Sequence, residues 1–451
     1  MKRLKQRWVV YWVRFWLTVI IATAWVMVSH AESAAPTATL SMPDAIQRAI
    51  ETHLTVRLAR ASTQEARGRA IQAAASLLPQ ITGQVSQSRI FKSNLAAQGF
   101  QASSFLPNPL IGPYNNFDAR VELVQTLLDV NAIWLTKEAS AQTRAAKLQE
   151  DLAAEQVASA AGLTYIESVR AVRAVQDAQA NLDLSQGLAR LAHQQHDAGA
   201  ATGVDVARAE THVAEDQQNL IQAQLTVLQA DIRLKRVVGI PLGATVTLTD
   251  SRRPETLAQP DEAAALHQAQ SDRVELRIAR EQVEAESHGL AAARSNVLPT
   301  VAAVGDYGFS GNEPQGSART GSIGARLSLP IFSGGSTYGD VKASKARYSA
   351  TQNQYDDIQI QVEEDVRLAL QTLPAEAEGV TTADTQVTLA ERELKLAQDR
   401  YAAGAGDNIQ VVSAQTALAG ARQSRVVAQA RYAEAQANLA MALGHMRTFQ
   451  L

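Results

Sequence analysis

The sequence predicts a mainly α-helical chain of two similar halves, each of which carries a small β part suited to a membrane. Residues 192–239 recur as residues 397–444 at a constant offset of 205 positions, without a gap. Aromatic residues make up 5% of the 451 residues, with only 25 Gly and 13 Pro, which favours long helices in close contact over a bulky core. Two pairs of segments alternate apolar and polar residues, which is typical of strands.

The repeated stretch reads in each copy as two helices joined by a glycine turn. Gly199 and Gly404 can take the positive φ that ends one helix, and an Asp or Asn shortly afterwards can begin the next. The duplication divides the chain into a first structural repeat at 32–239, an equatorial linker at 240–260 and a second repeat at 261–451, with hairpin tips at 198–204 and 403–408.

Residues 1–31 have the pattern of a signal peptide. Five basic residues precede or flank the apolar run 15–28, and small residues at 29 and 31 suit a signal peptidase. An uncleaved anchor is the alternative, although the run is short for a spanning helix. Without these residues, 37 basic residues stand against 45 acidic ones, and the formal charge changes from −3 to −8. Such a chain is a poor nucleic-acid binder, and the absence of Cys excludes disulfides, thiolate metal sites and lipidation on Cys.

The first half begins with helices and continues with two strands. A helix starts after Ser41, has a joint at 53–55 and stops at Pro79. Strands follow at about 80–91 and 116–128, separated by a long polar loop. In the second strand Phe117, Ala119, Val121 and Leu123 alternate with Asp118, Arg120 and Glu122. One apolar and one charged face fit a membrane barrel wall; a half-buried hairpin of a soluble sheet is the alternative.

Long helices follow, and the second half repeats the order. Residues 133–197 would form a helix of roughly 100 Å at 1.5 Å per residue, and a return helix reaches Val238. In the second half, strands are expected at about 299–310 and 320–331, followed by a helix from about Ser336. Pro374 predicts a break or kink in that helix, because proline lacks the N–H and clashes with the preceding turn.

Four strands in one chain imply that several copies share one barrel. Four strands cannot close a barrel, and lipid tolerates no open sheet edge. Three copies supply twelve strands, an even number as outer-membrane barrels usually have. The same three copies would bring their long helices together into a tube lined by polar residues.

In this order and spacing the residues resemble the TolC-like outer membrane efflux proteins. The resemblance rests on the duplication, on Leu-Pro before strands one and three, on residues 329–335 after strand four, and on residues 400–404 at the second tip. It implies a homotrimer with a twelve-stranded outer-membrane β-barrel continuous with a long periplasmic α-helical barrel. It further implies an exit duct for a tripartite efflux pump or type I secretion system, with a periplasmic adaptor protein and an inner-membrane transporter as partners.

The resemblance also places the functional residues at the tips. The adaptor would contact Ala198, Gly199, Ala200, Ala403, Gly404 and Ala405. The periplasmic gate would involve Asp205, Tyr401, Asp407 and Gln410. Gly406 stands where the family has a basic residue, and Gln410 and Ser413 stand where some members have acidic ones. A Tyr401 hydroxyl bonded to the Asp205 carboxylate would hold the gate shut; alternatively, Asp205 only caps the return helix.

Outside the tips, Trp134 and Tyr338 occupy equivalent positions just past strands, where aromatic residues would mark the periplasmic rim of the membrane. Ordinary packing is the alternative.

His193 and His196 lie beside Asp197 and could hold a metal, although a solvated surface is the commoner reading, so no metal or cofactor is expected. No catalytic motif is recognisable, so the chain is not expected to be an enzyme. The rival from another class is a signal-anchored helical coiled-coil protein with a structural or sensory role, which leaves the four strands unexplained. The cargo and the energy source of the pump are not encoded in any recognisable motif.

Overall fold

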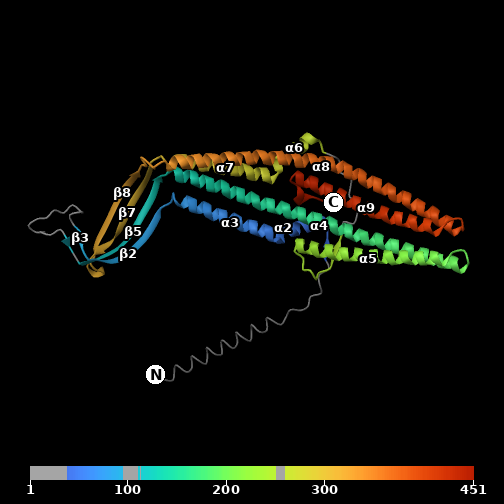
Figure 1. Ribbon diagram of the computed structural model, residues 1–451. Helices are drawn as coiled ribbons and strands as arrows, with labels where there is room; N and C mark the ends of the chain where they lie inside the picture. Colours follow the sequence, from blue (N-terminus) through green and yellow to red (C-terminus); the bar gives the residue numbers. More distant parts are fainter. Residues whose placement is uncertain (1–37, 95–109, 112, 250–259, 451) are drawn as a thin grey trace, which may run out of the picture.

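The computed structural model describes residues 38–94, 110–111, 113–249 and 260–450. The predicted signal peptide at 1–31 lies outside the described residues. The molecule is elongated, with a β-sheet at one end and two helical hairpin tips at the other (Figure 1). Its long axis is set by two helices of 68 and 67 residues, each about 100 Å at 1.5 Å per residue.

The helices follow the predicted order closely. Their bounds are α2 Met42–Thr52, α3 Leu54–Ala75, α4 Val130–Asp197, α5 Gly203–Val238, α6 Glu262–Asp272, α7 Val274–Ser295, α8 Ser336–Ala402 and α9 Asn408–Ala442, with 3₁₀ turns η2 Pro314–Gly316 and η3 Met446–Thr448. The predicted joint near residue 53 is confirmed: His53 ends α2 in extended conformation and accepts a hydrogen bond from the N–H of Thr55 at the start of α3. α4 packs along α5, α7 and α9, and α8 packs along α9.

Four strands form one antiparallel sheet in the order β2-β5-β7-β8. They are β2 Gln80–Ile90, β5 Tyr114–Leu128, β7 Thr300–Gly311 and β8 Ala318–Ser328. Thus both predicted hairpins exist and lie side by side, with β5 of the first paired to β7 of the second. The fourth strand ends at Ser328, three residues earlier than predicted, because Leu329 and Pro330 leave the sheet.

Two short strand pairs lie apart from this sheet. β3 Ser93–Asn94 pairs with β4 Leu110–Ile111 within the long first loop. β1 Ala38–Leu40 pairs in parallel with β6 Val246–Leu248, which belongs to the predicted linker. No local sequence pattern marks the pairing of this linker strand with residues 38–40, because the two segments lie far apart in the chain.

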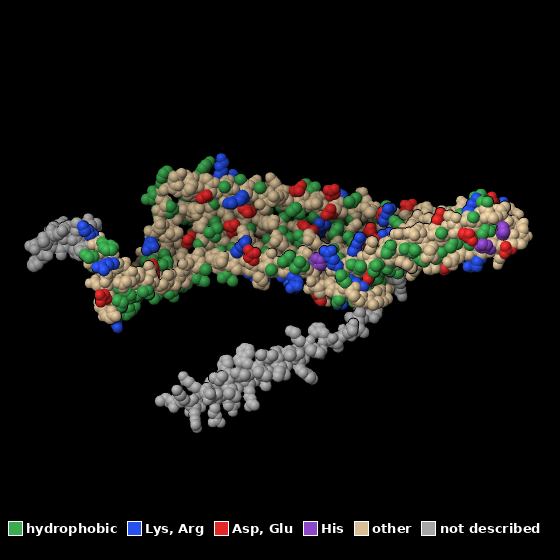
Figure 2. Space-filling model, turned by 60° about the horizontal axis from the view of Figure 1, so that its bottom comes forward, with side chains coloured by type: hydrophobic (Ala, Val, Ile, Leu, Met, Phe, Trp, Pro, Cys, Tyr) green, Lys and Arg blue, Asp and Glu red, His purple; other side chains and the backbone are tan. Residues whose placement is uncertain are grey.

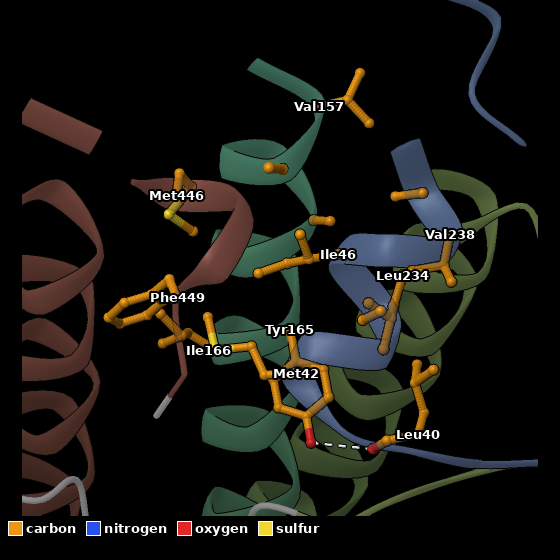
Figure 3. Packing of buried hydrophobic residues seen from close by; sticks show 14 of the residues in the cluster. Leu40, Met42, Ile46, Val157, Tyr165, Ile166, Leu234, Val238, Met446 and Phe449 are labelled. Atoms are coloured by element: carbon orange, nitrogen blue, oxygen red, sulfur yellow. Dashed lines mark hydrogen bonds between the residues drawn. The ribbon is translucent and has the colours of Figure 1, made fainter. Parts of the chain in front are cut away.

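The main apolar core joins the start and the end of the chain (Figure 3). Met42 and Ile46 of α2 pack against Tyr165 of α4, whose hydroxyl donates to the Leu40 carbonyl at 3.1 Å. Met446, from the C-terminal turn, enters the same cluster and is 1% exposed. Gly162 leaves room for it, since a Cβ there would lie 2.4 Å from the Met446 methyl carbon. The two halves are therefore fastened to each other near the middle of the long axis.

Of the break or kink predicted at Pro374, the break is wrong. α8 is helical from Ser336 to Ala402 with Pro374 inside it. Buried side chains on both sides of the proline hold the helix against α6 and α9: Leu370 and Leu373 precede it and Val380 follows. This packing outweighs the cost of about 3 kcal/mol for an internal proline. The helix changes direction where it passes α6 (Figure 1), as proline kinks do.

Candidate functional site

The sheet has one face of exposed apolar side chains, called here the outward face. Directly paired residues of an antiparallel sheet project to the same side, and the register pairs Leu123 with both Ile81 and Gly305. Large apolar residues of this face remain open in the single chain, with Ile323 94% and Val85 75% exposed. Others are Ile81, Val121, Leu123, Tyr307, Phe309 and Leu327. The alternation predicted from the sequence is confirmed on all four strands.

The opposite face is polar and is organised around Arg120. Its guanidinium donates to Asp118 of the same strand at 2.6 Å and to Asp306 of β7 at 3.3 Å. Ser322 of β8 donates a further hydrogen bond to Asp306. Gly308 lies opposite Arg120, and a Cβ there would approach the Ala119 carbonyl oxygen to 2.2 Å. Asp118 and Arg120 were predicted to lie on the charged face, and Asp306 was not, although the same alternation along β7 places it there.

Within the described part of the chain, the sheet is open at both edges. β2 pairs only with β5, and β8 pairs only with β7. An edge strand presents a row of unpaired N–H and C=O groups, which invites another strand. In lipid this row would carry a large cost, because no water is present to satisfy those groups. An exposed apolar face and two free edges therefore indicate that further strands pair with β2 and β8.

The two hairpin tips at the other end have the same backbone turn. Gly199 and Gly404 have φ of +74° and +69°, which glycine adopts at little cost. In the first tip the N–H of Gly199 donates to His196 and that of Ala200 to Gln195; the second tip repeats both bonds from Gly404 and Ala405. This is the Schellman pattern that closes a helix. All six residues predicted to meet an adaptor are exposed there: Ala198, Gly199, Ala200, Ala403, Gly404 and Ala405.

Asp205 lies in a capping box at the start of α5. Its carboxylate accepts from the N–H and the hydroxyl of Thr202, at 2.9 and 2.7 Å, and the N–H of Asp205 donates back to the Thr202 hydroxyl. These hydrogen bonds from Thr202, with the nearby Arg208, hold the pKa of Asp205 below its usual value. By the repeat, Asp407 corresponds to Thr202 and Gln410 to Asp205. Asp407 caps α9 by accepting from the N–H of Ile409 at 3.1 Å.

The proposed Tyr401–Asp205 hydrogen bond is not formed within this chain. The Tyr401 side chain is 5% exposed, and its hydroxyl has no hydrogen-bond partner among the described residues. Burial raises the pKa of Tyr401, and the charges of Asp205 and Asp407 raise it further. The capping alternative for Asp205 is therefore the contact that the structure shows.

Two other side chains connect the hairpins at the tips. Asn408, 1% exposed, donates from Nδ2 to the Asp205 carbonyl at 2.9 Å. Gln195 donates from Nε2 to the Tyr401 carbonyl at 3.3 Å. Neither residue was predicted from the sequence, because a side chain that bonds to a backbone carbonyl on another hairpin leaves no local pattern. All four predicted gate residues lie at this end of the molecule, at the ends of α5, α8 and α9.

The predicted rim aromatics lie near the starts of α4 and α8, beside the sheet (Figure 1). Trp134 is half-buried and lies against His288 of α7, with ring centroids 5.5 Å apart, while the Lys137 ammonium lies 4.3 Å from its ring centre. Tyr338 is 75% exposed. The packing alternative thus describes one contact of Trp134, and the membrane-rim role stays a prediction.

The histidines near the first tip take part in surface ion pairs. His193 lies 3.0 Å from Glu210 of α5, and His196 lies 3.6 Å from Asp197. Figure 2 shows histidine and charged side chains gathered at this end of the molecule. Throughout the described ranges, no group of three or more His, Cys, Asp or Glu residues is arranged to hold a metal. Nor is any helix in those ranges long and apolar enough to cross a membrane.

The chain is similar to outer-membrane channel proteins in sequence and in structure. It is 26% identical over 271 residues to the pyoverdine export outer membrane protein OpmQ of Pseudomonas aeruginosa, covering 59% of this chain and 56% of OpmQ. It is 23% identical over 265 residues to the outer membrane protein TolC of Escherichia coli, covering 56% of this chain and 54% of TolC. The matched region thus spans less than two thirds of either relative.

The fold likeness covers more of the molecule. The outer-membrane channel OprN matches with a TM-score of 0.78 at 20% identity, over 90% of each chain. VceC of Vibrio cholerae matches with a TM-score of 0.76 at 20% identity, over 89% of this chain and 96% of VceC. The family described as "Outer membrane efflux protein" matches residues 45–240 and 265–445, which cover most of both repeats. With this match, the duplicated hairpins and the open sheet, the chain belongs to the outer membrane efflux protein family.

Proposed function

We propose that this protein is the outer-membrane exit duct of a tripartite efflux or type I secretion system. The observation that carries the proposal is the open four-stranded sheet, whose outward face exposes residues such as Ile323 and whose edges β2 and β8 are free. Such a sheet suits a membrane only when further copies close it into a barrel. Three copies supply twelve strands and place β8 of each copy beside β2 of the next.

The polar face of the sheet then becomes the wall of an aqueous lumen. Arg120, Asp118 and Asp306 project to that side, and the long helices continue the tube into the periplasm. We assign repeats at 32–239 and 261–451 around an equatorial linker at 240–260, with 1–31 removed on export. The apolar core around Tyr165, which lies near the middle of the long axis, supports this assignment, because it packs one repeat against the other.

The tips supply the gate and the partner contact in this proposal. A duct between periplasm and exterior must be closed at rest, and the tips carry inter-hairpin bonds that can break, from Asn408 and Gln195. The exposed turns around Gly199 and Gly404 have the same backbone shape, so a periplasmic adaptor could bind both of them. An inner-membrane transporter would lie beneath the adaptor. OpmQ is named for pyoverdine export; the cargo of this chain is left open.

Native mass spectrometry and planar-bilayer recording of the purified full chain test the proposal. We expect a detergent-stable trimer that conducts ions. Ile323→Arg should prevent membrane assembly, since Arg at the middle of a lipid-facing barrel surface costs about 2–4 kcal/mol. Gly324→Arg is the matched control on the next residue, facing the lumen, and should still assemble and conduct. A protein that is only monomeric or dimeric, or equal tolerance of both substitutions, would overturn the proposal.

A further inference from the structure

The outward face ends in an arginine on each edge strand of the sheet. Arg89 of β2 projects to the same face of the sheet as Ile81 and Val85, because it lies an even number of residues from each. Arg319 of β8 projects to the same face as Ile323 and Leu327 for the same reason. The register confirms the side, because Arg319 pairs directly with Phe309, a residue of the outward face. Both arginines are exposed. A charged residue on a lipid-facing surface needs an explanation, because its ion is costly inside hydrocarbon.

Their depth places both arginines at the outer margin of the apolar surface. Arg89 lies eight residues beyond Ile81, and Arg319 lies eight residues before Leu327, counted in both cases away from the helices. Eight residues span about 27 Å along a strand, or roughly 20 Å along the normal of a tilted barrel wall whose apolar band is about 25 Å tall. Both guanidinium groups therefore reach the lipid headgroups on the side away from the helical tube.

Neither arginine has a carboxylate partner in the described part of the chain. Arg120 on the opposite face, in contrast, is paired with Asp118 and Asp306. The neighbours of Arg319 on its own face include the aromatic residue Phe309, and aromatic residues favour the interfacial level of a membrane. An unneutralised arginine at headgroup depth matches an anionic lipid and mismatches a neutral one.

Barrel closure would bring the two positions to one junction. β2 and β8 are the two free edges, so in the proposed trimer Arg319 of one copy and Arg89 of the neighbouring copy lie on adjacent strands. The inference rests on the proposed function for this step. Three junctions follow from three copies, each with two guanidinium groups on the outward face.

We propose that Arg89 and Arg319 bind the phosphate groups of the phosphorylated glycolipid of the outer leaflet, at one site per junction. Guanidinium presents paired N–H donors that match phosphate oxygens in bidentate geometry. The lipid would seal the junctions between copies on the exterior side, where β2 and β8 meet.

Native mass spectrometry of the detergent-solubilised full chain, titrated with diphosphoryl lipid A, tests this proposal. We expect up to three retained lipid A molecules per trimer and weaker retention of phosphatidylethanolamine. Arg89→Gln and Arg319→Gln should each lower lipid A affinity by about fivefold, the effect of one basic residue at an anionic membrane surface. Arg326→Gln is the matched control, since Arg326 lies on the same strand as Arg319 but pairs with Ala302 on the polar face.

The outcomes separate this inference from the proposed function. Bilayer conductance and trimer mass are recorded on the same preparations, so loss of assembly in a variant is seen directly. A conducting trimer that retains lipid A equally with and without Arg89 and Arg319 overturns the inference alone, as does equal loss in Arg326→Gln or equal retention of phosphatidylethanolamine. A wild-type protein that forms no conducting trimer overturns the proposed function.

Discussion

Replacing Asp205 with Ala should raise the resting conductance of the channel. The substitution removes the acceptor of two hydrogen bonds from Thr202, at 2.9 and 2.7 Å, at the start of α5. The turn before α5 would lose its capping box. The backbone carbonyl of Asp205, which accepts a hydrogen bond from the Asn408 side chain, would then be less well ordered. The contact between the two hairpins at the tip should weaken as a result.

The expected magnitude follows from the number of copies. The N-cap bond from the Asp205 N–H to the Thr202 hydroxyl remains in this variant, and loss of the carboxylate half of the capping box at this exposed helix end costs about 1 kcal/mol. If three tips open together, the costs add to about 3 kcal/mol, which multiplies the ratio of open to closed channels by roughly a hundredfold. Tyr401→Phe should add little, because its hydroxyl has no partner among the described residues.

Single-channel recording in planar bilayers measures this ratio directly. Asp197→Ala is the control: it removes the same charge from the same tip, but its side chain is 82% exposed and lies outside the capping box. We expect frequent or sustained openings in Asp205→Ala and wild-type behaviour in Asp197→Ala. Equal conductance in the two variants would refute the argument that the capping box holds the gate.

Three further predictions concern pH, backbone strain and the membrane rim. Hydrogen bonds from Thr202 lower the pKa of Asp205. The stabilisation that they give to the tip is therefore complete above the ordinary Asp pKa of about 3.9 and is lost as the pH falls through the lower folded-state pKa. Wild-type conductance should rise in that acidic window, and the conductance of Asp205→Asn should not change with pH there. Gly239→Ala should lower the melting temperature, measured by circular dichroism, more than Gly199→Ala does. Both substitutions incur left-handed backbone strain of about 1–2 kcal/mol, but only at Gly239 would the new Cβ meet a side chain, the Thr52 hydroxyl at 2.3 Å. Equal losses of melting temperature would contradict the steric argument. Brominated lipids should quench Trp134, the single Trp after residue 31, and emission unchanged at every bromine depth would remove it from the rim.

The periodicity of the amino-acid sequence by itself determined the elements of this chain. Period-two alternation located the four strands of the main sheet, and the repeated glycine turns located both tips, because these features depend on local backbone preference and on which side chains are apolar. Gly199 and Gly404 illustrate this: a helix that must reverse needs a left-handed residue, and glycine provides it. The family resemblance followed from the order of such local features.

Tertiary packing decided what local preference could not. Pro374 stays within a continuous helix because buried neighbours on both sides hold it. Asp205 bonds to Thr202 rather than to Tyr401, and Asn408 and Gln195 join the hairpins through backbone carbonyls that no sequence pattern marks. The C-terminal Met446 packs beside Gly162, far away in sequence. Each of these depends on which surfaces meet in three dimensions, where burial and hydrogen-bond satisfaction outweigh single-residue propensity.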